Sequence, residues 1–166
     1  MERRLLPPIL LLLLLAPLAP AKPVATRAPR PAPAFQLAGR TGSVALDSLR
    51  GRVVYLDFWA SWCEPCRRSF PWMETMHQRY AARGLTVVAI DLDKDRDAAD
   101  EFLARYPASF PVAFDPAGKT AEAYGVSAMP TSYLIGRDGA ILSTHAGFVP
   151  GKADGLEALI QEACAR

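Results

Sequence analysis

Two segments of the chain are almost continuously apolar. Residues 53–60 form a run that only Asp57 interrupts, and residues 86–92 form a second run. Continuous runs of this length are typical of strands that are buried on both faces, whereas a half-exposed strand alternates apolar and polar positions. The two segments therefore predict the central strands of a sheet that is covered on both sides.

Four further segments have the composition or the apolar spacing of helices. They are residues 64–82, 97–106, 119–124 and 154–165. Gly84, Pro107 and Gly125 follow the first three, and glycine and proline commonly end helices at such positions. Strands and helices thus alternate through the middle of the chain.

Shorter segments complete the predicted sheet. Residues 35–46 predict a hairpin around residues 39–42, residues 112–114 a short strand, and residues 132–144 a second hairpin. The resulting order is β-β, then β-α-β-α-β-α, then β-β-α. This order predicts an α/β fold in which a partly parallel sheet carries helices on both faces and ends in an antiparallel edge.

The N-terminus has the features of a secretory signal peptide. Charged residues 2–4 precede an apolar stretch at residues 5–18, and Ala19-Pro20-Ala21 supplies a small-residue cleavage site. The alternative is an uncleaved anchor in the inner membrane. The stretch is shorter than the ~20 residues that span a bilayer, and prolines interrupt it. We therefore expect residues 1–21 to be removed and the protein to be exported to the periplasm.

The segment after the signal peptide differs in composition from the rest. Residues 22–34 contain four prolines among alanines and basic residues, which is typical of an extended tether. Residues 35–166 are then a single domain, since a chain of 166 residues has room for little more than one core.

Charge and composition narrow the possible functions. The formal net charge is +2, too even a balance for the basic surface that nucleic-acid binders carry. Two histidines and three cysteines are too few and too scattered for a zinc site built by the protein. We expect neither a nucleic-acid partner nor a metal.

Cys63 and Cys66 are the strongest candidates for catalysis. Cys63 lies just beyond a buried strand at the start of a helix, where free N–H groups and the helix dipole stabilise a thiolate. Cys66 lies one turn inside the helix, close enough to form a disulfide with Cys63. We expect Cys63 to attack a partner disulfide and Cys66 to release it, so the redox-active disulfide serves in place of a cofactor.

Two residues between the cysteines can tune the pair. Pro65 suits the first helical turn because its missing N–H is not needed there. Glu64 places a negative charge beside the helix N-terminus, which disfavours a thiolate at Cys63 and predicts a reducing rather than an oxidising couple. An exposed acid with no tuning role is the alternative for Glu64.

Asp57 is the polar residue in an otherwise apolar strand. Burial raises the pKa of a carboxyl, and a carboxylate with a raised pKa can accept the proton of Cys66 as that thiol attacks. The alternative is an aspartate that bonds to the backbone at the end of the strand.

Met129-Pro130-Thr131 precedes the second hairpin. It is either a simple turn or, if the bond before Pro130 is cis, a bulge towards the active site that pairs with an extended client chain. Trp59 and Trp62 would form an apolar rim around this substrate-binding surface.

Residues 55–66, with the sequence YLDFWASWCEPC, closely resemble the active-site strand and loop of thioredoxin-like proteins. Residues 85–91, 124–126, 129–131 and 134–139 are similar to later segments of the exported TlpA/ResA/CcmG thiol–disulfide oxidoreductases. This group has an AhpC/TSA–Redoxin type of thioredoxin domain. The similarity covers about residues 35–163. It implies a three-layer thioredoxin fold with an added N-terminal β-hairpin, a cis bond before Pro130 and a nucleophilic Cys63. It also implies that the acid at Asp57 assists the buried cysteine, Cys66.

The resemblance implies protein thiol and disulfide clients and a membrane thiol relay as electron donor for a monomeric enzyme. Cys-Glu-Pro-Cys is similar to the ResA branch, which reduces the haem-binding cysteines of apocytochrome c. That branch has an acid three residues after its second cysteine, where this chain has Ser69. The CcmG branch has an acid soon after its cis-proline, where this chain has Thr131 and Ser132. The client is left open between apocytochrome c and periplasmic protein disulfides in general.

Two other functions are compatible with the fold. A peroxiredoxin needs Thr or Ser three residues before its cysteine and a proline seven residues before it, and this chain has Ala60 and Leu56 there. A non-catalytic module that docks peptides at Pro130 would not need the intact Cys63 and Cys66 pair. The sequence therefore favours an exported protein-disulfide reductase.

Overall fold

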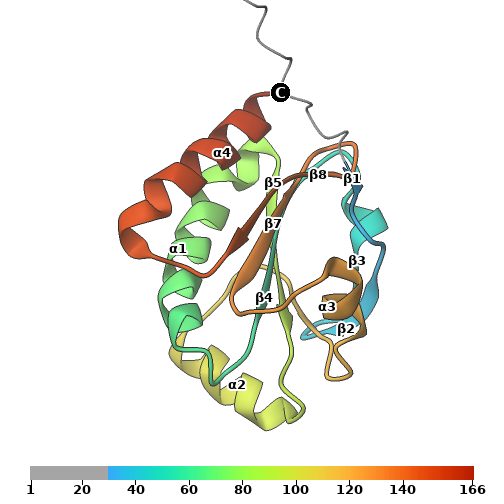
Figure 1. The fold of residues 1–166 in the computed structure, drawn as a ribbon, viewed down its shortest axis with the longest axis vertical. Coiled ribbons are helices and arrows are strands. Elements are labelled where there is room, and N and C mark those ends of the chain that lie inside the picture. The colour runs from blue at the N-terminus through green and yellow to red at the C-terminus, as the bar shows by residue number, and fades with distance from the viewer. Residues whose placement is uncertain (1–29) are drawn as a thin grey trace, which may run out of the picture.

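An eight-stranded mixed sheet forms the centre of the molecule, and the structure, a computed structural model, describes residues 30–166 (Figure 1). The strands are β1 (Arg30–Pro31), β2 (Gln36–Gly39), β3 (Ser43–Ala45), β4 (Val53–Trp59), β5 (Leu85–Asp91), β6 (Val112–Phe114), β7 (Thr131–Ile135) and β8 (Ala140–Ala146). The helices are α1 (Glu64–Tyr80), α2 (Arg96–Arg105), α3 (Lys119–Tyr124) and α4 (Ala153–Ala165). The predicted signal peptide and the first part of the predicted tether lie outside the described residues.

The strand order is β1-β8-β7-β4-β5-β6-β2-β3. β4 pairs in parallel with β5 and antiparallel with β7, and the β2–β3 hairpin extends the sheet by pairing antiparallel with β6. The predicted α/β architecture, with its N-terminal hairpin and its antiparallel edge, is confirmed. β4 lies at the centre, so the residue that follows it enters α1 from the middle of the sheet.

The two faces of the sheet carry separate apolar clusters, and β4 contributes to both. Helices α1, α2 and α4 lie on one side of the sheet, and α3 lies on the other side with the N-terminal hairpin (Figure 1). Tyr55 and Trp59 belong to the first cluster, whereas Leu56 and Phe58 belong to the second. Because successive side chains of a strand alternate between faces, Asp57 lies on the same face as Tyr55 and Trp59. The seven residues of β4 are all buried, as its continuous apolar sequence predicts.

The boundary between tether and domain lies earlier than the sequence indicates. Residues 30–34 are assigned to the tether by their composition, but Arg30 and Pro31 pair with β8 and the N–H of Ala32 donates to Gly139. The carbonyl of Pro33 then accepts a hydrogen bond from the Tyr124 hydroxyl at 2.8 Å. Between β1 and β2, Ala32 and Phe35 pack into the cluster beneath α3, so the segment is part of the fold.

Candidate functional site

Cys63 and Cys66 form a disulfide at the N-terminus of α1, with their Cα atoms 5.3 Å apart. Cys63 is the N-cap residue of α1, and its Sγ accepts a hydrogen bond from the N–H of Cys66 at 3.3 Å. Cys63 is 3% exposed and Cys66 is fully buried. Both cysteines are therefore buried, and of the two only Cys63 keeps a small exposed area, where the unpaired N–H groups of the helix lie.

The local sequence explains this placement. β4 ends at Trp59, and the carbonyl of Ala60 accepts a hydrogen bond from the N–H of Cys63, which closes a tight turn into the helix. Pro65 lies in the first turn of α1, where no hydrogen-bond donor is lost and the fixed φ of proline suits a helix. Both features bring the first cysteine to the mouth of the helix and the second beneath it.

Glu64 is exposed, and two arginines offset its charge. Its carboxylate lies 2.8 Å from Arg67 and 3.4 Å from Arg68, one turn further along α1. Exposed pairs of this kind contribute little to stability, about 0.2–1 kcal/mol each. They do place two positive charges beside the one negative charge, so the effect of Glu64 on a thiolate at Cys63 is weaker than its position in the sequence indicates.

Asp57 is buried within β4 and is 2% exposed. Its Oδ2 has no hydrogen-bond partner within residues 30–166, so the alternative of an aspartate tied to the backbone gains no support. Burial raises the pKa of this carboxyl well above its ordinary value. Asp57 has the burial and the raised pKa that the sequence predicts for a proton acceptor.

Two polar side chains near Asp57 are not predicted by the sequence. Ser132 lies directly opposite Asp57 in the β4–β7 ladder, and its Oγ is 2.9 Å from the hydroxyl of Tyr55. Burial and the charge of Asp57 together raise the pKa of Tyr55, so this phenol stays protonated. The face of β4 beneath α1 therefore carries a small polar group within an apolar cluster.

The peptide bond between Met129 and Pro130 is cis, as the resemblance implies. Met129 is half-buried against the cluster that contains both cysteines. No hydrogen bond joins the backbone of Met129 to another residue in the described part of the chain. Thr131 is buried and its hydroxyl donates to the carbonyl of Ala128 at 2.7 Å, so its side chain shapes this loop and does not face a client.

The prediction that Trp59 belongs to an apolar surface rim is wrong. Trp59 is fully buried, with its ring 4.7 Å from Phe70 and 4.5 Å from Phe102 between ring centres. Such aromatic pairs contribute about 0.5–1.5 kcal/mol beyond the area that they bury. Trp62 is 66% exposed and does lie on the surface next to Cys63, so the rim consists of Trp62 without Trp59.

The rest of the described chain adds no second reactive cluster. Residues 30–166 contain no group of three or more side chains that could hold a metal ion. Cys164 is a free, buried thiol on α4, where burial raises its pKa. In the same range, α1 and the other helices are too short or too polar to cross a membrane.

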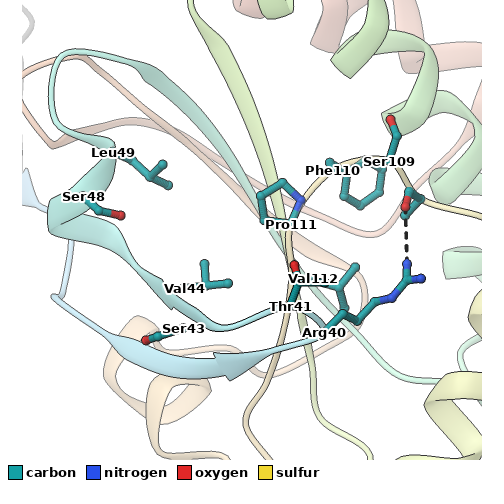
Figure 2. A pocket seen from close by; sticks show the side chains of 11 residues that line it. Arg40, Thr41, Ser43, Val44, Ser48, Leu49, Ser109, Phe110, Pro111 and Val112 are labelled. Atoms are coloured by element: carbon teal, nitrogen blue, oxygen red, sulfur yellow. Dashed lines mark hydrogen bonds between the residues drawn. The ribbon is translucent and has the colours of Figure 1, made fainter.

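A pocket of about 420 Å³ lies between the β2–β3 hairpin and residues 108–112 (Figure 2). Arg40 reaches across it to the carbonyl of Ala108 at 3.4 Å. None of the predicted site residues lines this pocket. The candidate site is instead the surface around the disulfide, which is typical of an enzyme that acts on protein chains rather than on a small molecule held in a cavity.

Comparison with known proteins agrees with the geometry. The sequence model of the Redoxin family matches residues 27–160. The chain is 35% identical over 117 residues to the thiol-disulfide oxidoreductase ResA of Bacillus thuringiensis subsp. konkukian, which covers 70% of this chain and 68% of that protein. It is 34% identical over 117 residues to ResA of Bacillus subtilis, which covers 70% of this chain and 65% of that protein.

A solved structure is more similar still. A putative thiol:disulfide interchange protein DsbE from Chlorobium tepidum is 53% identical, with a TM-score of 0.81, over 82% of this chain and 96% of that chain. These similarities agree with the disulfide at the N-terminus of α1 and with the cis-proline, since all of them point to the same family. The chain belongs to the Redoxin family and, within it, to the thioredoxin-like TlpA/ResA/CcmG thiol–disulfide oxidoreductases.

Proposed function

We propose that this thiol–disulfide oxidoreductase is an exported reductase of protein disulfides. The observation that carries the proposal is the placement of the two cysteines. Cys63 caps α1 and keeps a small exposed area, whereas Cys66 is fully buried in the first turn of the helix. This arrangement gives the first thiol access to a client and keeps the second available only to the first.

The reaction proceeds through one mixed disulfide. The thiolate of Cys63 attacks one sulfur of the client disulfide, the client S–S bond breaks, and the other client sulfur leaves as a thiolate. The thiol of Cys66 then gives its proton to the carboxylate of Asp57 and attacks the Sγ of Cys63. The Cys63–Cys66 disulfide forms, the second client thiolate leaves, and two electrons have passed to the client.

The client binds as an extended chain at the Met129–Pro130 loop. The backbone N–H and C=O of Met129 are free to pair with it, in the manner of an added strand. Exposed Trp62, next to Cys63 in the chain, supplies an apolar contact. Backbone pairing carries little sequence information, so this surface suits many protein disulfides.

The cellular setting follows from the N-terminal sequence. Residues 1–21 act as a cleaved signal peptide and deliver the enzyme to the periplasm, where a membrane thiol relay returns electrons to the Cys63–Cys66 disulfide. Apocytochrome c is one client class, as the likeness to ResA implies. Ser69, which replaces the acid of that branch, is buried and donates its hydroxyl to the carbonyl of Cys66 at 3.1 Å.

The reduction potential tests the direction of electron flow. We expect a value nearer the ~−270 mV of a reductase than the ~−120 mV of a strong oxidant. Glu64→Gln removes a charge that opposes the thiolate, so it stabilises the reduced form and should raise the potential. A charge at a helix N-terminus is worth about 0.3–1 kcal/mol, which corresponds to roughly 5–20 mV. Equilibration with glutathione and dithiothreitol buffers measures both values.

Glu162→Gln is the matched control for this measurement. Glu162 is also an exposed acid paired with an arginine one turn away, but it lies near the end of α4, far from the N-terminus of α1 (Figure 1). Its replacement should leave the potential unchanged. A wild-type potential near the oxidant end, or a fall on Glu64→Gln, contradicts the proposed direction.

Asp57→Asn tests the proposed proton acceptor. Because burial raises the pKa of Asp57, its carboxyl ionises at a higher pH than an ordinary aspartate, and the rate of mixed-disulfide resolution should rise with pH as it ionises. The amide of the variant cannot accept a proton, so we expect resolution at pH 7 to slow by roughly tenfold or more and to lose this dependence on pH. Stopped-flow measurement of client release between pH 5 and 9 gives both results.

The same variant should be more stable than the wild type at neutral pH. An unfolded aspartate ionises above about pH 4, whereas the buried carboxyl stays protonated to higher pH, so wild-type stability falls as pH rises between the two values. The asparagine side chain does not titrate. Urea unfolding should therefore give similar stabilities at pH 4 and a more stable variant at pH 8. A variant that is both slow and unstable at pH 8 would indicate a damaged fold instead.

A further inference from the structure

Asp93 binds the segment that leads to the redox pair. Its Oδ2 accepts a hydrogen bond from the N–H of Ser61 at 2.7 Å, and its Oδ1 accepts one from the Ser61 hydroxyl at 3.1 Å. Ser61 lies two residues before Cys63, between the end of β4 and the start of α1. Asp93 lies between β5 and α2 and is 8% exposed. A buried carboxylate on one segment thus holds the backbone and the side chain of another.

Few other bonds hold this segment. The N–H of Cys63 donates to Ala60 within the segment itself, and the N–H of Leu92 donates to Trp59 just before it. Next to Ser61, Trp62 is 66% exposed. Among residues 30–166, the carboxylate of Asp93 is therefore the side chain that is hydrogen-bonded to the turn before Cys63, and it ties that turn to the segment after β5.

Asp91 lies two residues before Asp93 at the end of β5, opposite Trp59 in the β4–β5 ladder. It is 1% exposed, and its Oδ1 has no partner within the described residues. Burial first, and then the hydrogen bond and charge of Asp93, raise its pKa to about 8, while Arg96 of α2 acts in the opposite direction.

We propose that Asp93 is a positioning residue for the redox pair, which holds Ser61 so that Cys63 stays at the N-cap of α1. The inference rests on the proposed function, because it concerns how that same thiol is made reactive. If Ser61 is released, Cys63 can move away from the N–H groups of the helix and its thiolate loses their stabilisation. Asp93 touches neither client nor sulfur, and it acts through Ser61.

Charge and position predict opposite results, which makes the proposal testable. If Asp93 acted only as a nearby negative charge, its removal would favour the thiolate and lower the pKa of Cys63. If it positions the segment, its removal raises that pKa. The rate of Cys63 alkylation by iodoacetamide in the reduced full-length protein, followed by peptide mass spectrometry from pH 5 to 9, distinguishes the two.

We expect Asp93→Ala to shift the midpoint of the Cys63 alkylation profile upwards by roughly half to one pH unit. Insulin reduction at pH 7 should slow about tenfold, in keeping with the loss of two hydrogen bonds to a carboxylate. Asp93→Asn keeps an acceptor for the Ser61 N–H and a donor for its hydroxyl, so it should stay within about threefold of the wild type. Ser61→Ala removes only the hydroxyl bond and should shift the midpoint in the same direction by less. It also keeps the test open if Asp93→Ala does not fold.

Asp95→Ala is the matched control. Asp95 also accepts a backbone N–H, that of Asp97, and caps α2, but it makes no contact with Ser61. Its removal should leave the Cys63 profile unchanged. An unchanged or lowered midpoint in Asp93→Ala, or an Asp93→Asn variant as impaired as Asp93→Ala, overturns the proposal. Alkylation needs no client, so a wild type that reduces no disulfide would count against the proposed function and not against Asp93.

Discussion

Cys63→Ser is expected to reduce the rate of insulin reduction to background, roughly a thousandfold or more below the wild type. A serine hydroxyl is not ionised at the mouth of α1 at neutral pH and does not exchange with disulfides, so neither the attack nor the mixed disulfide is possible. The other two cysteines should not take over, since Cys66 is fully buried, and Cys164 lies on α4 beside Arg137, where burial raises the pKa of its thiol. Turbidity of the released insulin chains measures the rate directly.

Cys164→Ser is the control for this variant. It makes the same chemical change at a buried cysteine on α4. The carbonyl of Cys164 accepts a hydrogen bond from Arg137, and its thiol has no part in the proposed reaction. It should keep wild-type activity. Activity near the wild-type level in Cys63→Ser would show that the disulfide at the mouth of α1 is not the reacting group.

Cys66→Ser is expected to stop the reaction halfway. Cys63 can still attack, so one equivalent of client thiol should appear in a rapid burst. The mixed disulfide then has no internal thiol to release it, and further turnover should fall by roughly a hundredfold or more, to the rate at which external thiols attack. Quenched-flow counting of released thiols measures the burst and the slow phase that follows.

The wild type provides the comparison for this result. With Cys66 present the mixed disulfide should not accumulate, and thiol release should continue for many turnovers while reductant lasts. The double variant Cys66→Ser, Cys164→Ser should trap the same adduct as the single variant. A Cys66→Ser protein that turns over at the wild-type rate would exclude Cys66 as the resolving thiol.

Most of the fold can be predicted from the sequence because the central elements have strong patterns. The run at residues 53–60 is β4 with one residue added at its end, and the predicted helix at residues 119–124 is α3 with the same bounds. Burial on both faces of a strand leaves a continuous apolar signal that few other structures produce.

The first strand could not be predicted in this way. β1 consists of Arg30 and Pro31 alone, in a stretch whose prolines and alanines resemble a linker. Its place in the sheet depends on the partner strand β8 and on the contact of Pro33 with Tyr124, which are remote in sequence. A two-residue strand has no periodicity of its own.

The errors at the site have physical causes as well. Closeness to Cys63 in the sequence suggests a surface position for Trp59, although the alternation of β4 places it beneath α2 with Phe70 and Phe102. Sequence reasoning misses Asp91 and Asp93, yet two acids at the end of a buried parallel strand are a usable signal. The carboxyl ends of β4 and β5 meet at the same edge, so acids there lie near the turn that precedes Cys63.

The arginine partners of Glu64 were also within reach of the sequence. Arg67 and Arg68 are three and four residues further along a predicted helix, which is the spacing of neighbouring side chains on a helix surface. The sequence alone leaves Glu64 as either a tuning acid or a passive one. The two positive charges favour a weak tuning role for Glu64. This is why the change in reduction potential predicted for Glu64→Gln is small.

The central claim is that Cys63 attacks and Cys66 resolves. Mass spectrometry of the two serine variants, each mixed in reduced form with the same disulfide client, tests it most directly. We predict a long-lived mixed disulfide on Cys63 in Cys66→Ser and no adduct in Cys63→Ser. An adduct that accumulates on Cys66 in the Cys63→Ser protein would contradict the assignment of the two roles.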